Sequence, residues 1–155
     1  MSDTTASSSS ASIVGPAAGP MLNILGTRNE VKLDGRDCNG LASAFEVTAG
    51  PGDGIPLHSH THEDELFYVL EGEVQFTEEG ETSIGQTGTF AFLPRGRKHA
   101  WFVVGDVPAR LLIMTIPGTF NAFFAELAHP VGTMRPMPEV IDICRRHGIE
   151  FYPAA

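Results

Sequence analysis

Length, composition and charge narrow what this chain can be. With 155 residues, 42% of them apolar, it is large enough for one domain with a buried core. Its 17 glycines and 11 prolines favour a turn-rich β protein over a helical bundle. The net charge of −9 argues against nucleic acids and anionic membrane surfaces as partners, and no apolar run reaches the ~20 residues of a membrane helix.

The cysteines and the amino terminus together predict where in the cell the protein is found. The first residues have neither a basic segment nor an apolar core, so they do not form a secretory signal. Only Cys38 and Cys144 are present, far apart in the sequence. We therefore expect two reduced thiols in a cytoplasmic protein, and a disulfide between them is the alternative.

In chain order, residues 1–20 are small and polar and have almost nothing to bury, which predicts a flexible tail. Short strand signals follow at 23–25 and 31–33. Residues 41–48 alternate in polarity and predict a half-buried strand. The glycine-rich stretch 50–54 then predicts a loop.

Histidines and a glutamate cluster directly after this loop. His58 and His60 are two residues apart, so in an extended segment both imidazoles lie on one face. Glu65 follows five residues later, and His99 comes after a further strand signal at 89–93. Imidazole nitrogens and a carboxylate oxygen are ligands of divalent metals, so we expect these four residues to bind one ion. Solvated loop histidines are the alternative.

Several strands surround the predicted ligands. Residues 66–70 are apolar at every position, which predicts a strand covered on both faces and hence a partner subunit. Glu71-Gly72-Glu73 predicts a tight hairpin into the next strand, 74–76. The apolar and aromatic strand residues expected to wall a substrate pocket are Phe45, Phe67, Phe90, Trp101 and Val103.

Two helices are expected after the strand at 109–116. The aromatic residues between Phe120 and Leu127 recur at helical spacing after Thr119, a suitable N-cap, and we expect them to pack against the outside of the strands. The second helix, 138–147, ends in basic residues and Gly148, as helix termini favour. We expect His129 and His147 to be structural.

Two motifs in this chain resemble those of the cupin superfamily. The first is Gly52-x5-His58-x-His60-x4-Glu65-x6-Gly72, and the second is Gly88-x5-Pro94-x-Gly96-x2-His99. Val103 stands where that family usually has Asn, which removes a polar group. The resemblance implies an all-β fold, a double-stranded β-helix (jelly-roll) barrel at 21–117, with two carboxy-terminal helices in an extension at 118–155.

The phrases from His58 to Gly72 and from Pro117 to Phe124 resemble small single-domain cupins of the quercetin dioxygenase-like group. This implies one divalent transition metal (Fe, Ni, Mn, Cu, Co or Zn), no organic cofactor, and an enzyme that oxidises a small aromatic or enolic molecule with dioxygen. Glu65 is the expected catalytic residue, as a ligand or, if it moves off the metal, as a base. The alternatives are a metal-dependent isomerase or polyketide cyclase, and a non-catalytic small-molecule-binding cupin. We expect a homodimer.

Overall fold

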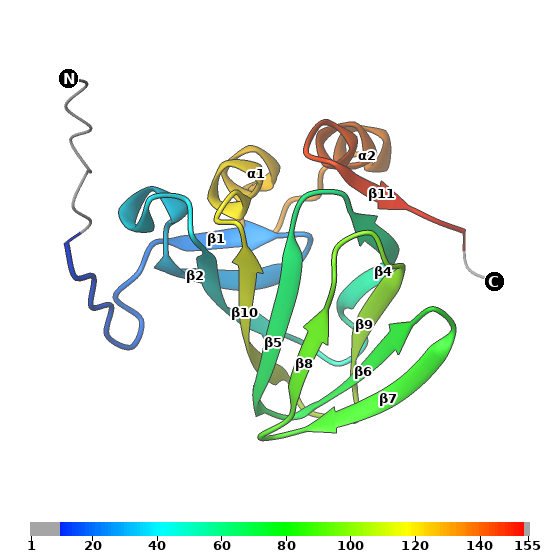
Figure 1. Cartoon of the computed structure of the whole chain (residues 1–155). Helices are drawn as coiled ribbons and strands as arrows, with labels where there is room; N and C mark the ends of the chain where they lie inside the picture. Colours follow the sequence, from blue (N-terminus) through cyan, green and yellow to red (C-terminus); the bar gives the residue numbers. More distant parts are fainter. Residues whose placement is uncertain (1–9, 154–155) are drawn as a thin grey trace.

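The computed structural model describes residues 10–153, and its strands form two facing antiparallel sheets (Figure 1). The larger sheet contains, in spatial order, β1 (Met21–Ile24), β2 (Thr27–Leu33), β3 (Ser43–Ala49), β10 (Ala109–Ile116), β5 (Asp64–Glu71) and β8 (Phe90–Leu93). The smaller contains β11 (Ile149–Phe151), β4 (Gly54–His60), β9 (His99–Val104), β6 (Glu73–Glu78) and β7 (Glu81–Gln86). The predicted all-β jelly roll is confirmed, although the two sheets do not close into a continuous barrel.

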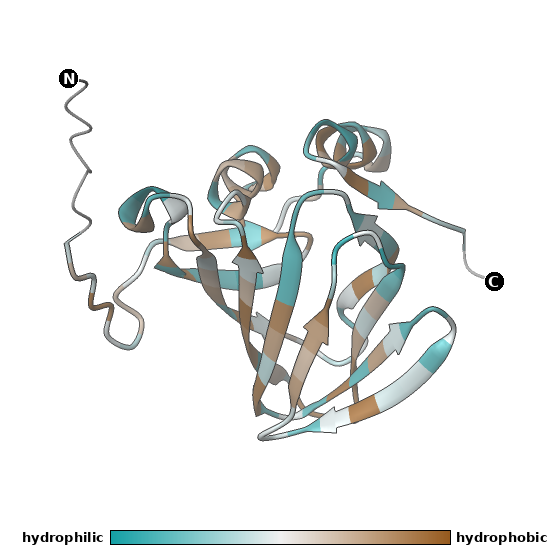
Figure 2. Ribbon diagram, viewed as in Figure 1, coloured by the Kyte–Doolittle hydropathy of each residue, from teal (hydrophilic) through white to brown (hydrophobic). Residues whose placement is uncertain are grey.

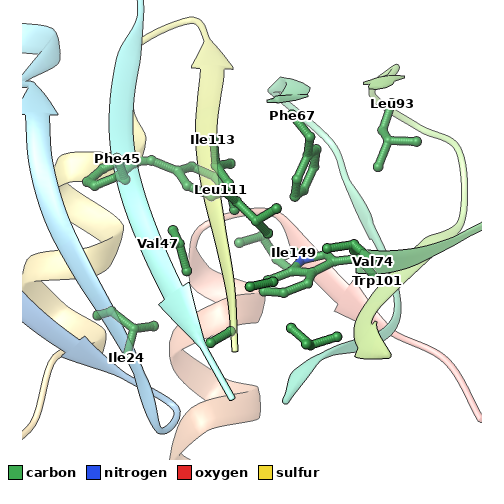
Figure 3. Packing of buried hydrophobic residues seen from close by; sticks show 14 of the residues in the cluster. Ile24, Phe45, Val47, Phe67, Val74, Leu93, Trp101, Leu111, Ile113 and Ile149 are labelled. Atoms are coloured by element: carbon green, nitrogen blue, oxygen red, sulfur yellow. The ribbon is translucent and has the colours of Figure 1, made fainter. Parts of the chain in front are cut away.

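The core lies between the sheets. Alternate residues of each strand point inward, and Phe45, Phe67 and Leu111 are each 0% exposed. Figure 3 shows Phe67 and Leu111 facing Trp101 and Val74 of the opposite sheet. Burying a side chain of this size stabilises the fold by roughly 1.5–3 kcal/mol, so the two inner faces hold the sheets together.

The predicted hairpin at Gly72 is wrong. β5 pairs with β10 and β8, whereas β6 pairs with β9 and β7, so the chain passes from one sheet to the other at this turn. Gly72 has a φ of 80°, and a Cβ there would lie 2.9 Å from the Ala109 Cα. Both the left-handed backbone and the close approach require glycine.

Within the described chain, the strand at 66–70 is covered on one face only, and coverage of the other face by a partner subunit stays a prediction. Phe67 and Val69 are fully buried, but Tyr68 on the outer face is 42% exposed. Figure 2 shows apolar residues on β5, β8 and β10, and only half of those positions point into the core. The outer apolar residues therefore remain accessible within the described chain.

The helices lie across one end of the sheets (Figure 1). A short 3-10 helix, η1 (Gly35–Cys38), precedes β3; α1 (Phe120–Leu127) contacts β1 and α2 (Met137–Arg146), and α2 contacts β11. Thr119 does precede α1, but its hydroxyl makes no capping hydrogen bond. The unpredicted strand β11 pairs with β4, so α2 is anchored beside the strand that carries His58 and His60.

The predicted flexible tail, 1–20, lies partly outside the described residues. From Gly15 to Pro20 the chain contacts β2: the Gly19 amide donates to Glu30 (2.9 Å), and Lys32 donates to the Gly15 carbonyl (3.1 Å). The Val31 amide also donates to the Pro20 carbonyl (2.9 Å). This part of the segment is therefore attached to β2. Neither helix in the described range is long and apolar enough to span a membrane.

Candidate metal centre

The four predicted ligands come together on the inner faces of three strands. Alternation along β4 places His58 and His60 inward, and β4–β9 pairing sets His58 opposite His99. Glu65 is the first inward residue of β5, in the facing sheet. One donor atom from each residue lies within 4.8 Å of every other, and all four side chains are buried.

Backbone carbonyls orient two of the imidazoles. His58 Nδ1 donates to the Pro56 carbonyl (2.7 Å), and His99 Nδ1 donates to the Arg97 carbonyl (3.1 Å). With Nδ1 engaged as a donor, Nε2 is the ring nitrogen left to face the centre, and His99 Nε2 lies 3.1 Å from Glu65 Oε2. This is the usual way in which a protein fixes the tautomer of a metal-binding histidine.

His60 provides the observation that tests whether a metal fits. Both of its ring nitrogens are buried and lack hydrogen-bond partners, and Nε2 lies 3.4 Å from Glu65 Oε2. A buried polar atom without a partner costs about 1–3 kcal/mol, so the fold would be expected to avoid it. Three imidazole nitrogens and one carboxylate around a common point satisfy the donor needs of a divalent ion, and the residues present therefore fit one.

The charges in the centre are strongly coupled. Burial would raise the pKa of Glu65, but the adjacent His60 and His99 outweigh it and hold the pKa well below its ordinary value. Burial would lower the pKa of His60, but Glu65 and Glu63 raise it to about 9. Burial lowers the pKa of His58 to about 3, with further contributions from the other two histidines. Glu65 is therefore ionised, and His58 is neutral.

An apolar cavity of about 60 Å³ adjoins the ligands. His58, His60 and Glu65 line it together with residues from both sheets and from α1. The α1 residues in its wall are Phe120, Phe123, Phe124 and Leu127, and the Phe120 ring lies 5.3 Å from the His60 ring. The aromatic face that the sequence analysis assigned to packing thus also closes the cavity, which helical spacing alone did not reveal.

The five predicted pocket residues have different positions. Trp101 lines the cavity and is 4% exposed. Phe45, Phe67 and Val103 are buried in the core but do not line it. Phe90 is 60% exposed, because Ala91 and Leu93 occupy the inward positions of β8. Of the five residues only Trp101 lines this cavity, and a role of any of them in substrate binding stays a prediction.

Glu63 is a functional candidate that the sequence analysis missed. It is 4% exposed, accepts a hydrogen bond from Thr119, and places Oε2 3.8 Å from His60 Nδ1. His62, which follows His60 by two residues and by strand alternation would share its face, is exposed beside Gly148. The inward and outward alternation of side chains ends at the turn between β4 and β5. The sequence therefore could not predict which way Glu63 and His62 point.

The comparisons with known proteins agree with this geometry. Residues 45–115 match the family model of the cupin domain, a span that contains all four ligand candidates. The protein has the cupin fold. An RmlC-like cupin from Shewanella frigidimarina superposes with a TM-score of 0.61 at 16% identity, covering 74% of this chain and 99% of that one, which shows the fold alone.

Two curated relatives of this chain have names that indicate a chemistry. Quercetin 2,3-dioxygenase of Bacillus subtilis is 28% identical over 100 residues, which are 64% of this chain and 29% of that protein. Tetracenomycin polyketide synthase protein TcmJ of Streptomyces glaucescens is 29% identical over 80 residues, which are 50% of this chain and 54% of that protein. The cupin thus spans about half or less of the length of these relatives.

Proposed function

We propose that this cupin is a metal-dependent dioxygenase acting on a small aromatic or enolic molecule. The observation that carries the proposal is the buried His60 ring, which makes no hydrogen bond and lies beside Glu65. The donors of His58 and His99 converge on the same point, at the wall of an apolar cavity. The similarity to quercetin 2,3-dioxygenase supports the choice of reaction.

The proposed roles follow from the positions of the side chains. His58, His60, Glu65 and His99 would hold one divalent ion, which supplies Lewis acidity and, if redox-active, a means of bringing a chelated substrate and dioxygen together. Glu65 is ionised and faces the cavity, so it can accept the proton of a substrate hydroxyl. Phe120 and Trp101 exclude water from that proton transfer.

The size of the cavity favours a single-ring substrate. Its volume of about 60 Å³ is well below the ~300–1,000 Å³ of sites that hold drug-sized ligands. A three-ring flavonol would require α1 to move, because four α1 side chains form part of the wall. A monocyclic catechol or short enol with two neighbouring oxygens fits the space and the ligand set better.

Oxygen uptake tests this proposal. Catechol and a set of monocyclic enols are mixed with metal-loaded protein in an oxygen electrode, under air and under nitrogen. We expect uptake that depends on both metal and substrate, and no product under nitrogen. Turnover that continues unchanged without oxygen would overturn the dioxygenase assignment.

A second candidate function is a metal-dependent isomerase or cyclase, which needs Lewis acidity but no dioxygen. The similarity to a tetracenomycin polyketide synthase protein favours it. A cupin that only binds its ligand would use the same donors. Product formed under nitrogen distinguishes the isomerase or cyclase, and tight binding without any product distinguishes the binding protein.

The proposal includes a cytoplasmic homodimer. Large apolar residues form what we call the outer aromatic face of the larger sheet: Leu66, Tyr68, Phe90, Phe92 and Met114. Phe90 and Phe92 are 60% and 55% exposed. A contiguous exposed apolar patch of this kind marks an interaction surface, and we assign it to a second copy of the chain.

A further inference from the structure

Buried polar residues on β2 line the cavity at a place that the metal centre does not use. Thr27 is 5% exposed and Asn29 is 2% exposed, and both contribute to the cavity wall. The neighbouring wall residues Ile24, Val47 and Ile55 are apolar. An amide in such surroundings requires an explanation, because burying its polar atoms without partners is unfavourable.

The hydrogen bonds of this pair leave one acceptor free. Asn29 Nδ2 donates to the Thr27 carbonyl (3.1 Å) and to Thr27 Oγ1 (2.9 Å). The Thr27 hydroxyl donates to the Ile24 carbonyl (2.7 Å), so it accepts from Asn29 and fixes the orientation of the amide. Both amide hydrogens and the hydroxyl hydrogen are therefore used.

The side-chain carbonyl oxygen of Asn29, Oδ1, has no hydrogen-bond donor assigned to it within the described chain. Within residues 10–153, the two bonds from Nδ2 are the only side-chain hydrogen bonds of Asn29. Oδ1 keeps two acceptor sites and cannot donate, and Asn29 forms part of the cavity wall. A group bound there must bring a donor, which is a hydroxyl or an N–H.

The strand order places Asn29 far from the ligands. β2 is separated from β5, which carries Glu65, by β3 and β10 in the same sheet. At ~4.8 Å per strand, the two backbones lie roughly 14 Å apart across the sheet. A ligand that chelates the metal therefore presents to Asn29 the end opposite its chelating oxygens.

We propose that Asn29 is a specificity-determining residue that accepts a hydrogen bond from a hydroxyl or amine group at the metal-distal end of the substrate. The inference rests on the proposed function, because it takes the chelating end of the substrate to lie at the metal centre. The substrate class is then a single-ring enol or catechol with a donor-bearing substituent on the far side of the ring.

Two isosteric ligands test this directly. We choose 4-(hydroxymethyl)catechol and 4-ethylcatechol, which differ only by a hydroxyl in place of a methyl group. Binding is measured by calorimetry under nitrogen to protein loaded with Zn²⁺, so that no turnover is needed. The wild type should bind the hydroxymethyl compound at least about tenfold more tightly, since a net hydrogen bond of ~1.4 kcal/mol is a factor of ten. An apolar wall alone would favour the ethyl compound.

The Asn29→Leu variant should reduce the ratio of the two dissociation constants to about one or below. As a matched control, Ile24→Leu changes an apolar wall residue at the same end of the cavity, and it should keep the wild-type ratio. A purely structural Asn29 would weaken both ligands equally and leave the ratio unchanged, which would overturn the inference. A wild type that does not prefer the hydroxymethyl compound would overturn it without any variant.

The same two ligands separate this inference from the proposed reaction. Oxygen uptake without a hydroxyl preference would overturn the role of Asn29 and leave the dioxygenase proposal in place. A hydroxyl preference without oxygen uptake would support the role of Asn29 and contradict the dioxygenase.

Discussion

Glu65 combines burial, a negative charge and two imidazole neighbours, at 3.1 Å from His99 Nε2 and 3.4 Å from His60 Nε2. The Glu65→Gln change keeps the shape and one oxygen donor but removes the charge and the proton acceptor. We expect weaker metal binding and a fall in turnover of about 100-fold or more, the lower range for loss of a general base. Steady-state rates at saturating metal measure it, and an unchanged rate would contradict the role of Glu65.

The pKa of His60 predicts how metal affinity depends on pH. A ring with a pKa of about 9 carries a proton at pH 7.5, and the metal must displace that proton. Affinity for Zn²⁺ should therefore rise about tenfold per pH unit between pH 7 and pH 8. Without metal, the free energy of unfolding should fall as pH rises from the ordinary value of 6.5 through about 9, because the folded state binds this proton more tightly. Calorimetric titrations at several pH values measure the first effect, and a flat affinity would contradict it.

At the residue level, the sequence predicted those side chains whose positions follow from strand alternation. His58, His60 and His99 lie on inner strand faces, and their spacing alone placed them there. Glu63 and Asn29 could not be predicted in the same way. Glu63 lies in a turn, and the environment of Asn29 depends on strands and a helix far along the chain.

Among the elements, α1 and α2 are joined by an ion-pair cluster centred on Glu126. Its carboxylate accepts hydrogen bonds from Arg146 and from His147 Nε2 (2.6 Å), and the His147 ring packs 5.2 Å from the Phe123 ring. These contacts hold α1 over the cavity that Phe123 lines.

Glu126→Gln should loosen α1 more than it destabilises the protein. The carboxylate is 37% exposed, so we expect only a small loss in the free energy of unfolding. Amide exchange in α1 should become faster, while exchange in β5 and β10 stays unchanged. Arg36→Ala, which breaks the exposed pair with Asp34, is the control and should leave α1 unaffected. Equal α1 exchange in both variants would show that the cluster does not hold the helix.

The helix α1 and the strand at 66–70 show what a sequence pattern can predict about an element and what it cannot. The spacing of the phenylalanines predicted α1, because one apolar face at helical period is a strong signal. What that face covers depends on the chain path after β10, which spacing does not contain. Likewise, the apolar run at 66–70 indicated a strand but could not distinguish an outer face covered by protein from one that is exposed.

For the whole molecule, the outer aromatic face predicts a dimer that a single charge can disrupt. Phe92→Lys places an ammonium group in the middle of this face, opposite Leu66. We expect a homodimer for the wild type and a monomer for the variant by light scattering at micromolar concentration. Ile84→Lys, at a 53% exposed apolar position on β7, is the control and should stay dimeric. A monomeric wild type would contradict the assignment of this face.

The jelly roll as a whole was predictable because its two motifs fix the strands that carry the ligands. The open edges of the sheets, the crossing at Gly72 and the position of the helices across one end were not, since they depend on pairing between distant segments.

The metal content of the purified protein tests the central claim most directly. Elemental analysis should find about one divalent ion per chain in the wild type and in His129→Ala, whose histidine lies outside the cluster, and far less in His58→Ala and His99→Ala. A chelator should lower the melting temperature of the first pair only, because an ion at a hundred times its dissociation constant adds ~2.7 kcal/mol to the free energy of unfolding. Equal metal content in all four proteins, or none in the wild type, would contradict the assignment of His58, His60, Glu65 and His99 as the metal centre.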